Sequence, residues 1–239
     1  MTDRSGTSSV ISVGRLYCDL IFSGIPRMPS FGTEIYASGF AVHAGGGACI
    51  TAAHLARLGR SSQLAAFLPS GPFGPTVRGE IRSAGVDLRL CQPAGADWPL
   101  QVTAALVGAE DRAFVTNRSG PAAPRLSPEV LRASGARHVH VGELATLIEM
   151  PEILGAARAA GLSISLDCSW DESLLAGDIS PLLGHVDVFL PNASEARRLG
   201  ELGIAADAAR LTVIKDGANG ARATMDGTTV SARVERALT

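Results

Sequence analysis

The chain has 239 residues, of which 46% are hydrophobic and 18% are charged, with a formal net charge of −2. This apolar content suffices for one substantial core, and the near-neutral charge gives no electrostatic basis for binding nucleic acid or an anionic membrane. No apolar stretch approaches the roughly 20 residues that span a bilayer, and the polar N-terminus lacks a secretory h-region. The four cysteines form no C-x-x-C pair and indicate neither a disulfide framework nor a metal site. We therefore expect a soluble, reduced, cytoplasmic protein without nucleic-acid or membrane partners.

The first part of the chain gives strands, helices and a long extended arm. An apolar run with β-branched residues predicts a buried strand, and apolar residues at helical spacing closed by a glycine predict a helix. In chain order these are a strand at 10–17, an extended hairpin arm at about 20–44, a helix at 47–58, a strand at 62–68 and a helix at 75–85.

The segment 99–120 differs from its neighbours. The strand-like LQVTAALV and RAFVTN flank the turn-like GAED, a pattern that predicts a β-hairpin. Neither this hairpin nor the earlier arm fits an alternation of strands and helices. We therefore assign about 20–44 and 99–117 to one small β-sheet outside the main sheet.

From residue 127 the chain alternates regularly. Ser127 and Pro128 form a helix start, with serine as N-cap and proline at the first helical position. Alternating strands and helices indicate parallel β-α-β units, hence one α/β domain over 1–239 with a mostly parallel sheet covered on both faces. The later elements are strands at 138–142, 162–169, 186–192 and 211–217, helices at 150–161, 171–177 and 194–203, and a hairpin at 221–234.

Polar residues follow most of these strands. Ligands bind at the carboxyl ends of parallel strands, and although one acid after a strand is usually a cap or turn residue, five strand ends on one edge predict a shared site. The residues in question are Asp19, Glu143, Asp167, the pair Asn192 and Glu195, and the pair Asp216 and Gly217.

Three glycines, Gly45, Gly46 and Gly47, directly precede the predicted helix at 47–58. They are consistent with a hinge or tight crossing, and equally with a ligand site where backbone amides and a helix dipole meet a hydroxyl-bearing or anionic molecule. The Walker A pattern is absent, and no G-x-G-x-x-G follows the first strand. The latter argues against a dinucleotide-binding first unit and hence against an NAD-linked dehydrogenase.

Asn192 and Glu195 stand three residues apart at the start of a predicted helix. One interpretation is a capping box. The other is an amide and a carboxylate facing a hydrated Mg²⁺, a cation that takes few protein ligands. The two are compatible.

Together these segments resemble the ribokinase-like, or PfkB, family of carbohydrate and nucleoside kinases. GGGACITAAHLARLG is similar to the family's N-terminal glycine signature, and SLDCSWD to its strand ending in aspartate. LPNASEARRL is similar to its N-x-x-E motif, and VIKDGANGA to its nucleotide turn. The segments also occur in the family's order.

The resemblance implies a three-layer α/β/α sandwich with a β-sheet lid and an ATP-dependent kinase of a sugar or nucleoside hydroxyl. It further implies ATP and Mg²⁺ as cofactors. The implied substrate residues are Asp19, Gly45, Gly46, Gly47 and, more weakly, Glu143; the implied nucleotide residues are Asn192, Asp216, Gly217 and Gly220; the implied metal residues are Asn192 and Glu195.

The sequence departs from the family pattern twice. Ile50 stands where the glycine-led helix usually carries an asparagine, so we expect substrate recognition to differ from that of ribokinase. The D-T-x-G-A-G-D motif that supplies the family's catalytic carboxylate and anion hole has no counterpart here. We therefore assign no catalytic residue, and expect either a fragment of a longer kinase or a shortened relative with little turnover.

Two further expectations concern partners. The alternative to a kinase is a non-catalytic sugar- or nucleoside-binding or regulatory relative that has lost phosphoryl transfer. The lid residues Tyr36, Phe40 and Val42 could pack across a homodimer or cover the chain's own substrate.

Overall fold

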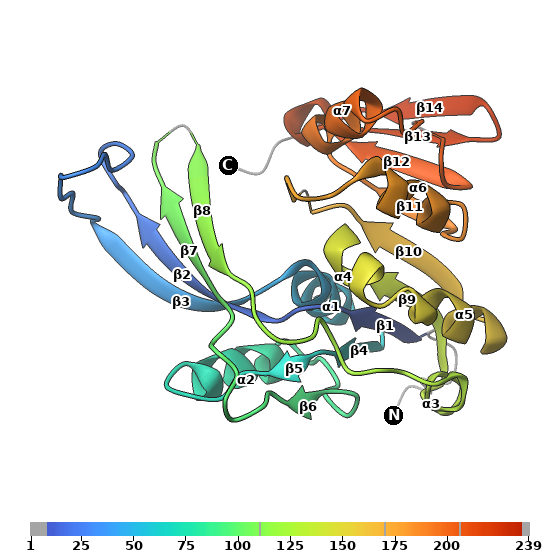
Figure 1. Ribbon diagram of the computed structural model, residues 1–239, viewed down its shortest axis with the longest axis horizontal. Coiled ribbons are helices and arrows are strands. Elements are labelled where there is room, and N and C mark those ends of the chain that lie inside the picture. The colour runs from blue at the N-terminus through green and yellow to red at the C-terminus, as the bar shows by residue number, and fades with distance from the viewer. Residues whose placement is uncertain (1–8, 110, 170, 206, 236–239) are drawn as a thin grey trace.

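The computed structural model describes residues 9–235 except 110, 170 and 206. The polar start of the chain, residues 1–8, lies outside the described residues. The main sheet has eight strands in the order β14-β13-β12-β11-β10-β9-β1-β4 (Figure 1). The six strands from β12 to β4 in this order pair in parallel, whereas β13 pairs antiparallel with both β12 and β14. Its strands are β1 Ser9–Val13, β4 Ser62–Ala65, β9 Ala136–Val141, β10 Ser163–Asp167, β11 Val188–Leu190, β12 Leu211–Lys215, β13 Ala221–Met225 and β14 Thr228–Ala232.

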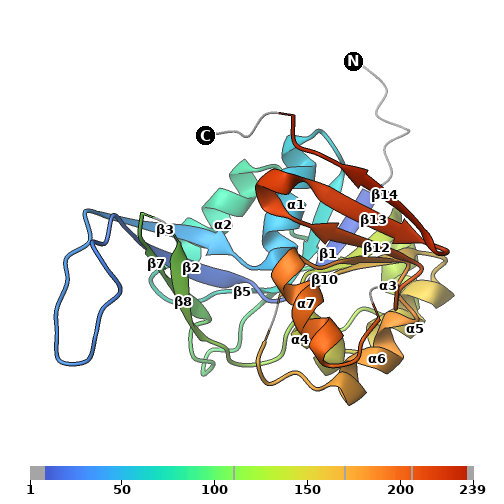
Figure 2. The ribbon, with the colours of Figure 1, turned by 90° about the horizontal axis from the view of Figure 1, so that it is seen from above.

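Helices lie on both faces of this sheet (Figure 2). Helices α1 and α2 lie on one face, with α1 against β1, β4 and β9, and α3 to α7 lie on the other. The helices are α1 Gly47–Arg57, α2 Gly74–Ser83, α3 Pro128–Ala133, α4 Leu144–Glu149, α5 Glu152–Ala159, α6 Ala176–Leu183 and α7 Ala193–Glu201, with a 3₁₀ turn η1 Gly217–Asn219. Two apolar clusters result, one on each face, with Leu64 and Ile81 in the first and Val139 and Leu166 in the second. None of the described helices is both long and apolar enough to cross a bilayer.

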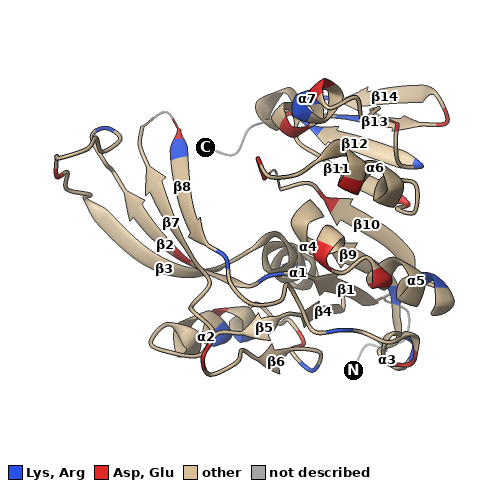
Figure 3. Ribbon diagram, in the orientation of Figure 1, with Lys and Arg blue, Asp and Glu red and all other residues tan. Residues whose placement is uncertain are grey.

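A second sheet stands apart from the main one and confirms the expected lid (Figure 1). It is ordered β3-β2-β7-β8, and its strands carry few charged residues (Figure 3). The strands are β2 Tyr17–Ser23, β3 Gly39–Gly45, β7 Val102–Val107 and β8 Arg112–Asn117; a separate two-stranded sheet pairs β5 Phe67–Leu68 with β6 Gln92–Pro93.

The structure differs from the predicted elements at the first strand and at two helices. The run 10–17 is not one strand, because Gly14 and Arg15 interrupt it and the chain passes from β1 into the lid strand β2. Helix α4 went unpredicted, since it is short and its residues 144–147 are all buried, so that no amphipathic stripe marks it. The short helix expected at 171–177 lies instead at Ala176–Leu183, and includes Pro181, which reads as a helix breaker.

Candidate active site

Four of the predicted strand ends meet along one edge of the main sheet. Because β9, β10, β11 and β12 are parallel neighbours, the residues that follow them lie side by side. Glu143 is the N-cap of α4 just after β9, Asp167 ends β10, Asn192 is the N-cap of α7 just after β11, and Asp216 follows β12. The structure therefore places these groups in a row, as predicted.

Asp19 reaches the site from a different element than predicted. It does not follow a strand of the main sheet but lies within the lid strand β2, because β1 ends at Val13. Burial raises the pKa of its carboxyl group, and a hydrogen bond with the Thr103 side chain on the neighbouring strand β7 partly opposes this shift. The lid thus contributes a partly desolvated carboxylate of its own.

The first of the three glycines leaves room for that carboxylate. A Cβ at Gly45 would come within 2.1–2.3 Å of the Asp19 carboxyl atoms, so any larger residue there would force the Asp19 side chain to move. Asp19 and Gly45 are therefore directly in contact.

The other two glycines are explained by chain crossings. Gly46 has φ of 97°, and a Cβ there would lie 2.3 Å from the Arg15 carbonyl oxygen. A Cβ at Gly47 would lie 2.2 Å from the carbonyl oxygen of Gly142, the residue just before Glu143. The tight crossing considered for the glycine run is thus present, and it brings the N-terminus of α1 against the end of β9.

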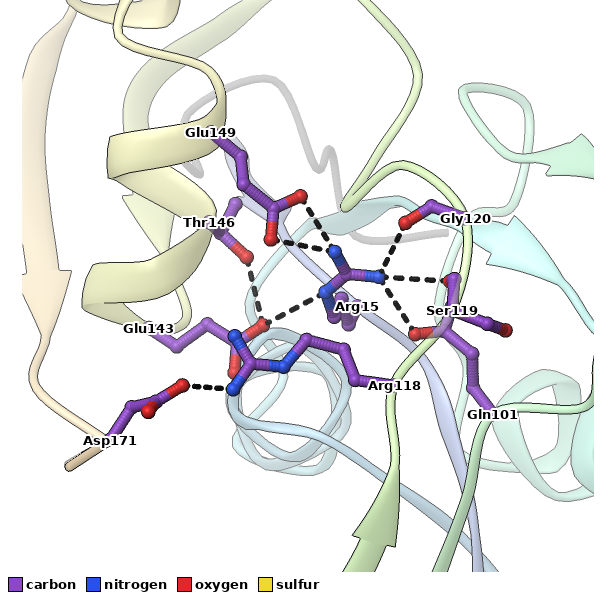
Figure 4. A network of polar contacts seen from close by, with 9 residues as sticks. All are labelled: Arg15, Gln101, Arg118, Ser119, Gly120, Glu143, Thr146, Glu149 and Asp171. Atoms are coloured by element: carbon purple, nitrogen blue, oxygen red, sulfur yellow. Dashed lines mark hydrogen bonds and ion pairs between the residues drawn. The ribbon is translucent and has the colours of Figure 1, made fainter. Parts of the chain in front are cut away.

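Arg15 joins the lid to the core beside this crossing (Figure 4). Its side chain is only 3% exposed. Nη2 donates to both Glu149 carboxylate oxygens, at 2.7 and 2.6 Å. Nη1 donates to the chain segments that lead into and out of the lid hairpin, with acceptors Gln101 Oε1 at 2.9 Å, Ser119 O at 3.0 Å and Gly120 O at 2.9 Å. One guanidinium therefore fixes the root of the lid to helix α4.

Glu143 lies in the same buried region. One of its carboxylate oxygens accepts a hydrogen bond from Thr146 Oγ1 at 2.9 Å and lies 4.0 Å from Arg15 Nε. Burial raises the pKa of Glu143, while the Thr146 hydroxyl and the positive charge of Arg15 oppose the shift. Glu143 is therefore held by protein groups, next to the lid root.

A second ion pair links the lid to the core. Arg118, just after β8, pairs with Asp171, which follows β10 on the core side (Figure 4). Hydrogen bonds from Ser173 and Arg118 lower the pKa of Asp171 to about 2. Sequence reasoning missed Arg15, Arg118 and Asp171 as a group, because their partners are far apart in the chain.

The Asn192–Glu195 pair forms the capping box at the start of α7. Asn192 Oδ1 accepts from the Glu195 amide at 2.9 Å, and Glu195 Oε2 accepts from the Asn192 amide at 2.6 Å. Among the described residues there is no cluster of three or more histidine, cysteine, aspartate or glutamate side chains that could enclose a metal. An oxygen-only donor set with so few protein ligands fits Mg²⁺ held mainly by water and phosphate.

The turn after β12 has the predicted glycines and borders a cavity. Gly217 and Gly220 have φ of 52° and 100°, and a Cβ at Gly220 would lie 2.0 Å from the Ala232 carbonyl oxygen. A cavity of about 550 Å³ opens beside Asp216, between α7 and strands β12 to β14. Three arginines line it, namely Arg197, Arg222 and Arg233. Guanidinium groups of this kind suit the binding of phosphate.

The lid strands and the edge of the main sheet thus offer two kinds of polar group. Asp19 and Gly45 at the lid end can meet a polyol, while the α7 N-terminus and the arginine-lined cavity at the other end can meet an anion. Lys215, at the end of β12, was also missed; its Nζ donates to Asp167 Oδ1 at 2.7 Å. Such an edge can hold two ligands and pass a group between them.

Comparisons with known proteins agree with this geometry. Residues 8–233 match the model described as pfkB family carbohydrate kinase. No curated protein matches the sequence.

Solved structures share the fold at low identity. A ribokinase from Cryptococcus neoformans var. grubii serotype A in complex with ADP has a TM-score of 0.78 and 18% identity, covering 97% of this chain and 80% of its own. A sugar kinase from Pyrococcus horikoshii in complex with ATP has a TM-score of 0.76 and 18% identity, with 96% and 78% covered. A nucleoside kinase from Methanocaldococcus jannaschii has a TM-score of 0.74 and 14% identity, with 98% and 79% covered.

Proposed function

Because the chain belongs to the pfkB family of carbohydrate kinases, we propose that it binds ATP and a sugar or nucleoside and transfers the γ-phosphate to a hydroxyl of that substrate. The observation that carries the proposal is the row of polar groups from Glu143 to Asp216 along one edge of the main sheet, together with Asp19 on the lid strand β2. In the reaction the substrate oxygen bonds to the γ-phosphorus as the bond to the β–γ bridging oxygen breaks, and the hydroxyl proton passes to a carboxylate.

The residues of the chain divide into two groups in this proposal. Asp19 accepts hydrogen bonds from substrate hydroxyls and the amides at Gly45 to Gly47 line the same end, with Glu143 close by. The nucleotide lies toward Asn192 and the turn from Asp216 to Gly220. When bound, Mg²⁺ neutralises phosphate charge, and Asn192 and Glu195 would hold it with its waters.

The test is substrate-dependent ADP release from ATP over a panel of sugars and nucleosides. Asp19→Asn should reduce kcat/KM at least tenfold, because it removes a charged acceptor of substrate hydroxyls. Asp226→Asn, in the β13–β14 turn, is the matched control and should leave activity unchanged. Saturable sugar binding that Asp19→Asn abolishes, with no ADP from any substrate, would favour the non-catalytic relative instead.

We also propose that the lid pairs with that of a second copy of the chain. Tyr36 and Phe40 are 77% and 58% exposed, and both line an apolar groove of about 460 Å³ on the lid. Val42, by contrast, is partly buried against the core cluster beneath α1 and α2, so we no longer include it among the residues that contact the second copy. Light scattering should give a dimer that Phe40→Ser converts to monomer; a monomer at all concentrations contradicts the pairing.

The cytoplasmic location expected from composition stays a prediction.

A further inference from the structure

Lys215 is the only lysine in the sequence, while the other 20 of its 21 lysine and arginine residues are arginines. All the remaining basic positions carry arginine, which suffices where only a positive charge or a planar donor is needed. Lysine differs in being a compact point charge on a flexible stem, with three donors that no planar geometry constrains. Its single use therefore marks position 215 as a place where an ammonium group has a particular task.

The structure puts this ammonium in the middle of the carboxyl edge. Lys215 ends β12, yet its Nζ bonds Asp167 at the end of β10, two strands away in the order β12-β11-β10. Neighbouring strands are about 4.8 Å apart, so the two side chains and the 2.7 Å bond between them together bridge roughly 10 Å across the end of β11. Nζ is thus directed away from the Asp216 cavity and toward the β9 end, where Glu143 lies.

The ion pair with Asp167 does not by itself explain why residue 215 is a lysine and not an arginine. The Lys215 side chain is 46% exposed and Asp167 is partly exposed, and such surface pairs contribute about 0–1 kcal/mol to stability. An arginine would serve an exposed pair equally well. A positive charge between two ligand sites, in contrast, would stabilise charge on a phosphate that moves from one to the other.

We propose that Lys215 binds the terminal phosphate of the nucleotide during transfer, with Asp167 as the positioning residue that holds the ammonium over the end of β11. This rests on the proposed kinase function. Asp167 Oδ1 also accepts the Cys168 amide at 2.9 Å, so its carboxylate is itself fixed in orientation. No bond to Lys215 forms or breaks in this role.

Because the chain has one lysine, the proposal can be tested on the intact protein by amine acylation. N-hydroxysuccinimide acetate should acetylate Lys215 and the terminal α-amino group, which serves as the internal reference in peptide mass spectrometry. ATP should slow acetylation of Lys215 at least fivefold, AMP should not, and neither should change the α-amino group. Equal labelling of Lys215 with ATP bound, as judged by calorimetric titration, overturns the Lys215 assignment and leaves the kinase proposal standing.

Variants give the second measurement. Lys215→Met should weaken ATP binding at least tenfold and leave AMP binding within twofold, with Tm unchanged. The ATP affinity of Lys215→Arg should lie between those of the unchanged chain and Lys215→Met. Asp167→Asn should reduce ATP affinity less than Lys215→Met does. The double variant Lys215→Met, Asp167→Asn should bind ATP no more weakly than Lys215→Met alone. Arg60→Met, at an exposed position three residues after α1, controls for the loss of one positive charge. If the unchanged chain binds no ATP, the proposed function fails and this inference with it; if Lys215→Met binds ATP normally, only the inference fails.

Discussion

The two ends of the carboxyl edge are built differently. At the lid end, the Arg15 side chain is buried, the Glu143 side chain is only 14% exposed, and both are bonded to other protein groups across four segments of the chain. At the β12 end, Asn192, Lys215 and Asp216 are exposed, and a cavity opens beside them. The first end is thus fixed by the protein itself, whereas the second keeps polar groups accessible to a ligand. Substitutions should therefore affect stability at the lid end and ligand binding at the β12 end.

The largest effect is expected from Arg15→Met. Losing the guanidinium leaves Glu149, 35% exposed, without its bidentate partner and the mostly buried Glu143 without a nearby positive charge, so the free energy of unfolding should fall by about 3 kcal/mol, the lower end of the range for buried pairs. Arg125→Met is the matched control, since Arg125 is 88% exposed and lies 3.6 Å from Glu152; it should change stability by less than about 1 kcal/mol. Urea unfolding measures both. Equal losses of unfolding free energy in Arg15→Met and Arg125→Met would show that the contacts of Arg15 stabilise the fold no more than an exposed ion pair does.

Gly47→Ala tests the chain crossing at the same end. The added methyl group would meet the Gly142 carbonyl oxygen at 2.2 Å, and backbone on both sides restricts relaxation, so we expect a loss of about 1–3 kcal/mol or more. Gly155→Ala in α5 has nothing within 4 Å of the new Cβ and should gain up to about 1 kcal/mol from helix propensity. Thermal unfolding that shows no loss for Gly47→Ala would contradict the crossing.

The main sheet should also carry a specific pH dependence, through His140 on β9. Its ring bonds Ser165 Oγ at 2.9 Å and Thr51 Oγ1 at 3.2 Å, and burial lowers its pKa from 6.5 to about 4. Between these values the unfolded chain binds more protons than the folded one, so stability falls as pH drops from about 6.5 toward 4. At pH 5 the loss attributable to His140 is about 2 kcal/mol relative to pH 7.

The measurement is the difference in unfolding free energy between the unchanged chain and His140→Gln across this range. Taking the difference removes the contribution of the carboxyl groups, among them Asp19 and Glu143, whose raised pKa values act in the opposite direction. Parallel curves from pH 7 to 5 would assign the acid sensitivity elsewhere.

The smallest effect on stability is expected at the β12 end, from substitution of Asn192. Asn192→Ala removes the N-cap acceptor of α7 and should cost about 1 kcal/mol. Asn192→Ser keeps a good capping side chain, so its stability should stay within a few tenths of a kcal/mol. ATP affinity lost in the stable serine variant would assign the amide a ligand role; affinity retained there and in the alanine variant would leave the residue a helix cap only.

Much of the fold follows from local pattern. Alternating apolar runs and helical spacing placed the strands after residue 127, and every helix there except α4, in the right order; Ser127 accepts from the Val130 amide as the predicted N-cap. The segment at 99–117 is the predicted hairpin of β7 and β8, and it pairs with the arm at 20–44 through β2. Periodicity and turn chemistry are local properties, and the sequence carries them directly.

The site was predicted where it depends on strand ends and missed where it depends on packing. Glu143, Asn192 and Asp216 follow strands that periodicity identifies, so their common edge could be inferred. Asp19 was placed on the wrong sheet, because an uninterrupted apolar run from 10 to 17 conceals the change of sheet at Gly14 and Arg15.

By itself, the sequence determined the α/β alternation, the lid hairpin, the helix caps and the polar strand ends, because each is written within a few neighbouring residues. Only the tertiary structure decided that Arg15 meets Glu149, 134 residues away, and that Lys215 meets Asp167, 48 residues away. Long side chains choose partners by the distances that packing leaves between elements, and no spacing along the chain encodes those distances.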